Sequence, residues 1–307
     1  MRQIVFLVPP KVHLLDVNGP AHLFYEAKEL GASLEIIFSS ISNSTIEVES
    51  SSGLYFSRLM RLESLNLTEN DFVFIPGSAT IKKVISEHPQ LLQYLNEWNN
   101  SKVRLCSICV GSYWLAEAGI IDFKKSTTHW KYLDDFSKTF PKTKVVEDCL
   151  FVIEDNLYLS AGVSSGMDLT LHILEDLFGY DMAIKVAKEV VYFFRRGSSD
   201  PQISTFLKYR NHLDTRIHDV QDFIVKNINK QFTLDELANE VHMSKRNMSR
   251  KFKKTTRMTV GEYLNKVRIE RAKHLLAGEL KLEEVARECG LKSTNQLRKI
   301  LKESEIA

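Results

Sequence analysis

Short apolar runs alternate with helical periodicities over the first two thirds of the chain. Residues 4–8, 34–38, 71–75 and 103–108 form such runs, and Pro or Gly residues follow three of them. Continuous apolar runs are typical of strands buried on both faces of a parallel sheet. Helical spacing of apolar residues occurs between these strands and after them, at 111–118, 164–177 and 182–194. This alternation predicts an α/β domain in which helices cover both faces of a mostly parallel sheet.

Two further patterns limit this domain. Residues 150–153 and 157–160 are apolar and flank Glu154-Asp155-Asn156, which predicts a hairpin. The helical pattern then breaks at the turn-rich segment 195–201. We therefore expect an α/β domain at 1–195, a linker at 196–214 and a second domain at 215–307.

The second domain repeats one helical pattern. Apolar residues at positions i, i+3, i+4 and i+7 occur twice, 48 residues apart, as Leu234, Leu237, Ala238 and Val241 and as Leu282, Val285, Ala286 and Cys289. After each set comes a short turn, then Ser244 or Ser293 at a position to cap a second helix. Three Ser/Thr-x-x-Glu/Gln capping boxes support these boundaries, at Thr233/Glu236, Thr259/Glu262 and Ser293/Gln296. The pattern predicts an all-α domain with two helix-turn-helix units, joined by one long helix over residues 260–277.

Composition narrows the class of protein. The 307 residues are 44% hydrophobic and 26% charged, and no apolar stretch approaches the roughly 18 residues of a membrane span. The first apolar run has no small-residue cleavage site, so we expect it to be a strand and not a signal peptide. With four cysteines and no export signal, we expect a cytoplasmic location and no membrane partner. No cofactor is expected, and no metal is expected because neither Cys149 nor Cys289 has metal-ligand neighbours in the sequence.

Charge is distributed unevenly between the two domains. Residues 1–209 hold 20 basic and 25 acidic side chains, whereas residues 210–307 hold 21 basic and 14 acidic ones. In the first unit, the second helix carries side chains suited to bases and phosphates, namely Lys245, Arg246, Asn247, Ser249, Arg250 and Lys253. The comparable surface of the second unit is more polar and comprises Thr294, Asn295, Gln296, Arg298 and Lys299. These surfaces predict a double-stranded DNA partner; the alternative is a helical interaction domain with a solvated basic face.

The α/β domain carries a candidate reactive site. Cys109 stands where the strand 103–108 turns into a helix, a place where a side chain is presented at the carboxyl edge of the sheet. The helix field there favours a thiolate. His129 is a candidate base, Asp16 follows the first strand, and Gly77 is positioned to offer a backbone donor. Cys109 has three interpretations: a nucleophile, a ligand-pocket residue, or a packed small side chain.

Both domains resemble known families. Residues 215–302 resemble the AraC family of transcription regulators, on Met243-Ser244, Arg250-Lys251-Phe252 and Cys289-Gly290 among others. Residues 1–195 are similar to ThiJ/PfpI domains of the class I glutamine amidotransferase-like superfamily, on Leu15-Asp16 and Cys109-Val110-Gly111. Two positions depart from the families: Leu291 stands where Phe is usual, and Ser78 replaces a Gly. The resemblance implies a flavodoxin-like or amidotransferase-like fold and DNA-facing roles for the basic residues above.

The whole chain resembles regulators in which these two domains are fused. The resemblance implies a pocket that senses a small, often nitrogen-containing, metabolite. We expect a homodimeric, sequence-specific DNA-binding regulator and no enzyme activity. The alternative is a thiol-dependent hydrolase, amidase or glyoxalase-like enzyme that uses Cys109 and is fused to a DNA-binding domain. A third alternative is a protein-interaction scaffold, which salt-insensitive DNA binding would favour.

Overall fold

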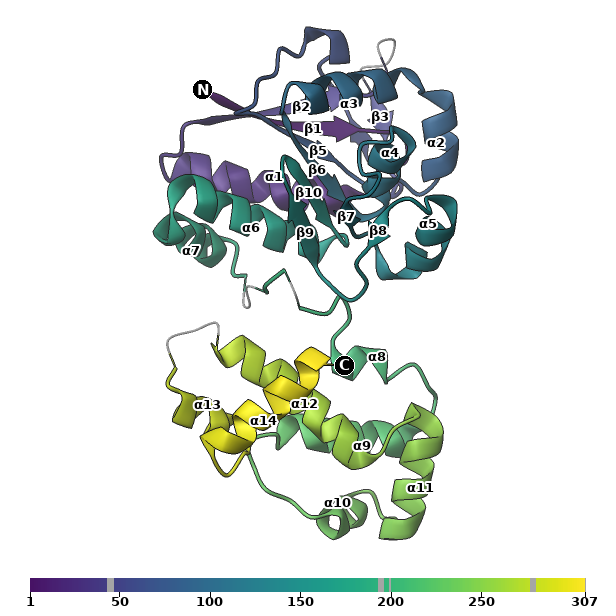
Figure 1. Ribbon diagram of the computed structural model, residues 1–307, viewed down its shortest axis with the longest axis vertical. Coiled ribbons are helices and arrows are strands. Elements are labelled where there is room, and N and C mark those ends of the chain that lie inside the picture. The colour runs from purple at the N-terminus through teal and green to yellow at the C-terminus, as the bar shows by residue number, and fades with distance from the viewer. Residues whose placement is uncertain (43–46, 193–195, 199, 277–279, 307) are drawn as a thin grey trace. The chain divides into compact units, whose positions relative to one another are not determined.

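The computed structural model describes residues 1–42, 47–192, 196–198, 200–276 and 280–306. The chain forms two compact units, Met1–Gln202 and Ile203–Ala307, and each is described by itself (Figure 1). The division between them falls within the predicted linker 196–214. Residue 195, where the α/β domain was expected to end, lies outside the described residues, so the domain boundaries stay a prediction.

The first unit is built on a six-stranded sheet in the order β2-β1-β5-β6-β10-β9. All neighbouring pairs are parallel except β9 and β10, which form the predicted hairpin. The strands are β1 (Arg2–Val8), β2 (Leu34–Ser40), β5 (Phe72–Ile75), β6 (Arg104–Ile108), β9 (Phe151–Glu154) and β10 (Leu157–Ser160). The predicted flavodoxin-like α/β fold is confirmed, because β2-β1-β5-β6 has the order of that fold.

Helices cover both faces of this sheet (Figure 1). One layer consists of α1 (Leu14–Glu29), α6 (Ser164–Phe178) and α7 (Tyr180–Glu189), which pack against one another. The other face carries α2 (Ile81–Glu87), α3 (Gln90–Asn100) and α4 (Ser112–Glu117). The remaining elements are α5 (Leu133–Thr139), the pair β3 (Val48–Glu49) and β4 (Tyr55–Phe56), the pair β7 (Lys125–Ser126) and β8 (Lys144–Val145), and three 3-10 turns at Leu62–Ser64, Cys109–Gly111 and Trp130–Tyr132.

The helix expected at 182–194 ends earlier than predicted. Val191 has a φ of +52°, and its amide and that of Tyr192 close onto the carbonyls of Lys188 and Ala187. A left-handed residue after a helix satisfies its last carbonyls and stops it. Residues 193–194 of the predicted segment lie outside the described residues.

The second unit contains seven helices among its described residues. They are α8 (Thr205–Lys208), α9 (Thr215–Lys226), α10 (Leu234–Glu240), α11 (Lys245–Thr256), α12 (Val260–Leu276), α13 (Leu282–Glu288) and α14 (Thr294–Ile306). α10–α11 and α13–α14 are the two predicted helix-turn-helix units. α12 supplies side chains to two separate apolar cores, one shared with α9, α10 and α11 and one with α13 and α14. Residue 277, the predicted end of α12, lies outside the described residues.

Some local predictions differ from the structure. Leu234 and Leu282, expected to face inward, are 38% and 36% exposed because each begins its helix at the edge of its core. The capping boxes at Thr233 and Thr259 form in full. At Ser293 only half of the box forms, because the Gln296 side-chain oxygen accepts from the Lys292 amide instead of the Ser293 amide.

Within the described part of the chain, every helix is too short or too polar to cross a bilayer.

Candidate functional site

The candidate pocket lies where the order of the sheet reverses. β2 is added on one side of β1 and β5 on the other, so the loops that leave the carboxyl ends of β1 and β5 diverge. Such a switch point is the usual ligand site of an open α/β sheet. The loop after β1 brings His13, the first turn of α1 brings Asp16, the loop after β5 brings Gly77, and Cys109 directly follows β6. The structure therefore gathers three of the four predicted pocket residues at one edge.

Cys109 occupies a strained elbow. Its φ is +58°, a left-handed value that is costly for a residue with a Cβ. Close packing behind the elbow requires glycine at 111, because a Cβ there would lie 1.9 Å from the Ile75 carbonyl oxygen. Gly162 packs on the other side, and a Cβ on it would come 3.2 Å from the Cys109 Sγ. Gly162 thus packs directly on the thiol, and Gly111 lets the elbow lie against the end of β5.

Asp16 is the acceptor at the centre of the pocket. Its side chain is fully buried, and each carboxylate oxygen accepts a backbone amide at 3.1 Å, one from Gly77 and one from Val163. The carboxylate therefore connects the loop after β5 to the loop that opens α6. Buried charge is stable only when donors of this kind replace water. Gly77 serves as a backbone donor, as predicted, but it donates to Asp16.

The reactivity expected of Cys109 is not supported by its surroundings. Burial raises the pKa of the Cys109 thiol, and the negative charge of Asp16 raises it further, while a hydrogen bond from the Val110 amide lowers it less. These surroundings disfavour the thiolate that the helix field alone was expected to favour. α4 has only six residues, so its field is weak beside these opposing effects.

His129 does not act as the predicted base in this arrangement. Its Nδ1 accepts a hydrogen bond from the Lys131 amide at 3.3 Å, and burial lowers its pKa, so the ring is neutral with one nitrogen engaged. Among the described residues no hydrogen bond joins it to Cys109. The neighbouring residue Thr128 does contact Cys109, since its hydroxyl donates to the Cys109 backbone carbonyl at 3.1 Å.

The imidazole beside the thiol belongs to His13, which the sequence reasoning missed. Its Nδ1 lies 3.7 Å from an Asp16 oxygen, and the ligand atoms of His13, Asp16 and Cys109 all lie within 4.8 Å of one another. Only its position offered a signal, since His13 precedes Asp16 by three residues, at the start of the helix that follows the first strand. These three residues are a donor set that can hold a metal ion. The carboxylate already serves two amides, however, and we keep the prediction that no metal is bound.

The predicted DNA-facing side chains of the first helix-turn-helix unit gather on one face of α11. Met248 and Phe252 are fully buried, which turns the opposite face outward. That face exposes Lys245, Arg246, Asn247, Arg250 and Lys253, with Ser249 half-buried among them. Two internal contacts hold this surface: Lys245 pairs with Asp235 at 2.9 Å, and Arg250 donates to the Asn247 side chain at 3.3 Å.

The second helix-turn-helix unit repeats this arrangement with fewer charged side chains. α14 exposes Asn295, Gln296, Arg298 and Lys299, and Thr294 is half-buried. Arg298 donates to the Asn295 side chain at 3.3 Å, as Arg250 does to Asn247. The oxygen of the Gln296 side chain is occupied by the Lys292 amide, which leaves its NH₂ group to face a partner.

Within Ile203–Ala307, a set of buried contacts around Arg268 and Gly290, here named the joint, fixes the two helix-turn-helix units to each other. Arg268 on α12 is only 8% exposed, and its Nη2 donates to the Lys230 carbonyl at 3.2 Å. Gly290, in the turn of the second helix-turn-helix unit, has a φ of +65°, and a Cβ there would lie 2.4 Å from the Ile228 carbonyl oxygen. The Gln231 side chain donates to the Gly290 carbonyl at 3.1 Å. The helical pattern of residues 260–277 does not mark Arg268 as buried, and sequence reasoning did not find this joint.

Comparison with known proteins agrees with both halves of this description. Residues 2–176 match the DJ-1/PfpI family, and residues 237–304 match a helix-turn-helix domain. The HTH-type transcriptional regulator GbdR of Pseudomonas aeruginosa is 28% identical over 235 residues, which cover 76% of this chain and 63% of that protein. The isonitrile hydratase of Pseudomonas putida is 28% identical over 205 residues, which cover 64% of this chain and 83% of the enzyme.

A solved structure supports the fold of the first unit. An AraC family transcriptional regulator from Pseudomonas putida superposes with a TM-score of 0.55 at 20% identity, over 62% of this chain and all of that one. The expected combination of domains is confirmed by these matches. The chain belongs to the DJ-1/PfpI family and joins this domain to an AraC-type helix-turn-helix domain.

Proposed function

We propose that this protein is a sequence-specific DNA-binding transcription regulator, controlled by a small molecule that binds at the edge of the sheet beside Cys109. The observation that carries the proposal is the outward face of α11, where Arg246, Asn247 and Arg250 project together from a helix-turn-helix unit. Arg can bind guanine with two hydrogen bonds and Asn can bind adenine in the same way. The protein acts as a homodimer in the cytoplasm, where promoter DNA is reached.

The spacing of the two readers supports this role. α12 has 17 residues, which at ~1.5 Å each give a rod of about 26 Å between the two helix-turn-helix units. Successive major-groove segments on one side of a duplex are separated by about 34 Å. With the joint at Arg268 fixing their relative position, α11 and α14 have a spacing suited to adjacent turns of one site.

The chemistry of the pocket favours a nitrogen-containing effector. Asp16 offers carboxylate oxygens, and His13 is a half-buried imidazole whose Nδ1 lies 3.7 Å from one of them. Carboxylate oxygens accept hydrogen bonds, and a neutral imidazole accepts at one of its two ring nitrogens. An ammonium or amide on the ligand would supply the matching donors.

A thiol-dependent enzyme is the second candidate. The strained elbow at Cys109 and the similarity to an isonitrile hydratase favour it. The raised pKa of the thiol opposes it, because the thiolate is the nucleophile. Cys109→Ser separates the two: an enzyme loses its turnover of candidate substrates, whereas a sensor keeps operator binding and its response to a ligand.

Selection of genomic DNA fragments by the full-length protein tests the main proposal. We expect a discrete set of promoter fragments to be enriched, with an affinity about 10³-fold or more above that for random duplex. Affinity for both should fall as salt is raised, since phosphate contacts release counterions. Failure to enrich any fragment over bulk DNA at moderate ionic strength would refute the proposal.

A further inference from the structure

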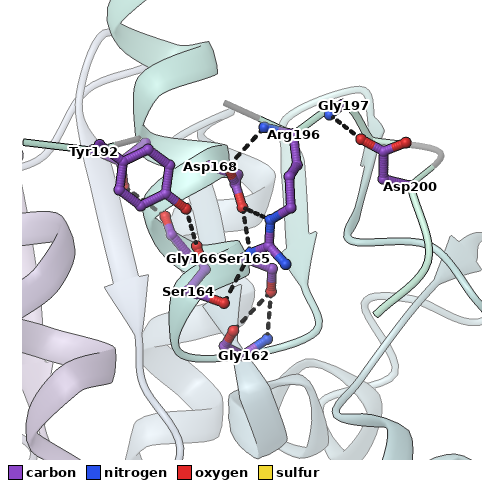
Figure 2. Close-up of polar contacts among 10 residues, drawn as sticks. Gly162, Ser164, Ser165, Gly166, Asp168, Tyr192, Arg196, Gly197 and Asp200 are labelled. Atoms are coloured by element: carbon purple, nitrogen blue, oxygen red, sulfur yellow. Dashed lines mark hydrogen bonds and ion pairs between the residues drawn. The ribbon is translucent and has the colours of Figure 1, made fainter. Parts of the chain in front are cut away.

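The last residues of the first unit are clamped to its core by an arginine (Figure 2). The Asp168 carboxylate, fully buried on α6, accepts the Nε, the Nη2 and the backbone amide of Arg196, at 2.9, 2.6 and 3.1 Å. The same guanidinium donates to the Ser164 hydroxyl at 2.8 Å. Burial raises the pKa of Asp168, while Arg196 and, to a lesser extent, a hydrogen bond with Tyr192 oppose that rise, so the carboxylate depends mainly on Arg196 for its charge. A surface linker would not need such an anchor.

The clamp leads directly to the candidate pocket. Ser164 is the first residue of α6, and the two residues before it, Gly162 and Val163, contact the candidate site. The Val163 amide donates to Asp16, and Gly162 packs on Cys109. One short loop therefore contacts the pocket carboxylate and thiol on one side and, through Ser164, the guanidinium of Arg196 on the other.

A second set of hydrogen bonds holds the segment after Arg196, this time to the loop that contains Thr127 and Thr128. The side-chain amide of Gln202 donates to the Thr127 hydroxyl at 3.3 Å and to the Thr128 carbonyl at 3.1 Å. The hydroxyl of Thr128 in turn donates to the Cys109 carbonyl. Residues 196–198 and 200–202, here named the connector, are thus fixed near both ends to loops that touch Cys109. Ile203, the next residue, begins the DNA-binding unit.

The loop under the clamp is conformationally strained. Val163 has φ +36° and ψ −100°, and Gly162 has φ +130°. A β-branched residue does not adopt a positive φ unless its neighbours force it. The forces here are the Val163 hydrogen bond to Asp16 and the packing of Gly162 on Cys109. A ligand that takes over the Asp16 carboxylate would release the loop to a relaxed conformation.

We propose that Arg196 and Gln202 are the positioning residues that report occupancy of the pocket to the DNA-binding unit: ligand contact at Asp16 or Cys109 shifts the loops at 162–164 and 127–129, and this loosens the connector. This inference rests on the proposed function and names its route of control. The proposal requires a coupling free energy between the ligand site and the DNA site, so that ligand changes the affinity for DNA and DNA changes the affinity for ligand by the same factor.

The test perturbs the pocket without needing its ligand. Gly162→Ala places a Cβ 3.0 Å from the Cys109 Cβ at a φ that disfavours it, and Thr128→Val removes the hydroxyl that supports the Cys109 carbonyl with little change in shape. Each is made in the full-length chain, alone and together with Arg196→Gln or Gln202→Ala. Arg210→Gln is the matched control, because it breaks the bidentate pair with Asp222 in the second unit.

The first readout is amide hydrogen exchange, which does not depend on DNA. We expect either pocket variant to speed exchange in the connector about tenfold or more, while strand β1 keeps its protection. Unchanged connector exchange in both variants would overturn the inference. This holds whether or not the protein binds DNA, so the result is independent of the proposed function.

The second readout is affinity for a fragment enriched by the wild-type protein. We expect a pocket variant to change the Kd about fivefold or more in the intact chain and in the Arg210→Gln control. The change should shrink to less than about twofold when Arg196 or Gln202 is also replaced. A shift of equal size in these double variants, or none in the intact chain, contradicts the route. Absence of any enriched fragment would instead refute the proposed function alone.

Discussion

Replacement of Arg268 by Met should weaken site recognition without unfolding the second unit. The long methionine side chain keeps much of the buried volume of the arginine stem. It removes one hydrogen bond from a charged donor to the Lys230 carbonyl, which is worth about 1.5–3 kcal/mol. It also removes a guanidinium whose Nε has no partner and whose pKa is lowered by burial. These effects offset each other, so we expect the free energy of unfolding to change by about 1 kcal/mol or less.

The cost should appear in DNA binding because the joint sets the spacing of the two readers. If α11 and α14 are no longer held in register, the second reader binds only after it is oriented, at a cost of about 1–2 kcal/mol. We therefore expect the Kd for an enriched fragment to rise about 5–30-fold, with little change for random duplex. Fluorescence anisotropy with labelled duplexes measures both values.

A change in the site gives the decisive comparison. Insertion of 5 base pairs between the two contacted segments turns one away from the other by about half a helical turn. The wild-type protein should lose most of its specific affinity for this duplex, whereas Arg268→Met should lose much less. Equal discrimination by the two proteins, or an equal loss on random DNA, would refute the idea that Arg268 fixes the spacing.

Four further results are expected. Arg246→Ala and Arg250→Ala should each cost about 1–3 kcal/mol on an enriched fragment if they contact bases, and an equal loss on random duplex in titrations would assign them to phosphates. Phe252→Ala, at a fully buried position, should destabilise the second unit by about 3–5 kcal/mol in calorimetry, whereas the exposed Arg246→Ala should leave its transition unchanged. Alkylation of Cys109 by iodoacetamide, followed by peptide mass, should be slow at neutral pH and accelerate as the pH rises, because its raised pKa leaves little thiolate below that value. Asp16→Asn removes the charge that contributes to this rise and should speed alkylation; a fast wild-type rate at neutral pH would contradict the assignment.

The sequence was informative wherever a local pattern decides the structure. Apolar runs such as residues 4–8 became central strands, and the repeated helical faces became two cores on α12. The basic face of α11 followed from the inward positions of Met248 and Phe252, because a helix that buries one side must expose the other. These features depend on residues that are close together in the chain.

Contacts between distant segments were beyond the reach of the pattern. The neighbours that set the pKa of Cys109 come from other loops, so the field of a nearby helix was a poor guide. His13 was missed because a lone histidine gives no periodic signal. Arg268 looked like one more surface charge, and only its contact with Lys230, 38 residues away, reveals its place.

The same separation in sequence has a practical consequence for Asp16. Its two amide partners lie 61 and 147 residues further along the chain, so the acceptor is assembled only when the whole first unit is folded. The unfolded chain cannot retain a compound that needs both neighbouring loops, and mass action then shifts the unfolding equilibrium. At a concentration 100 times its Kd, a bound compound would add about 2.7 kcal/mol to the stability of this unit. Thermal-shift screening of metabolites can therefore identify the effector before any operator is known.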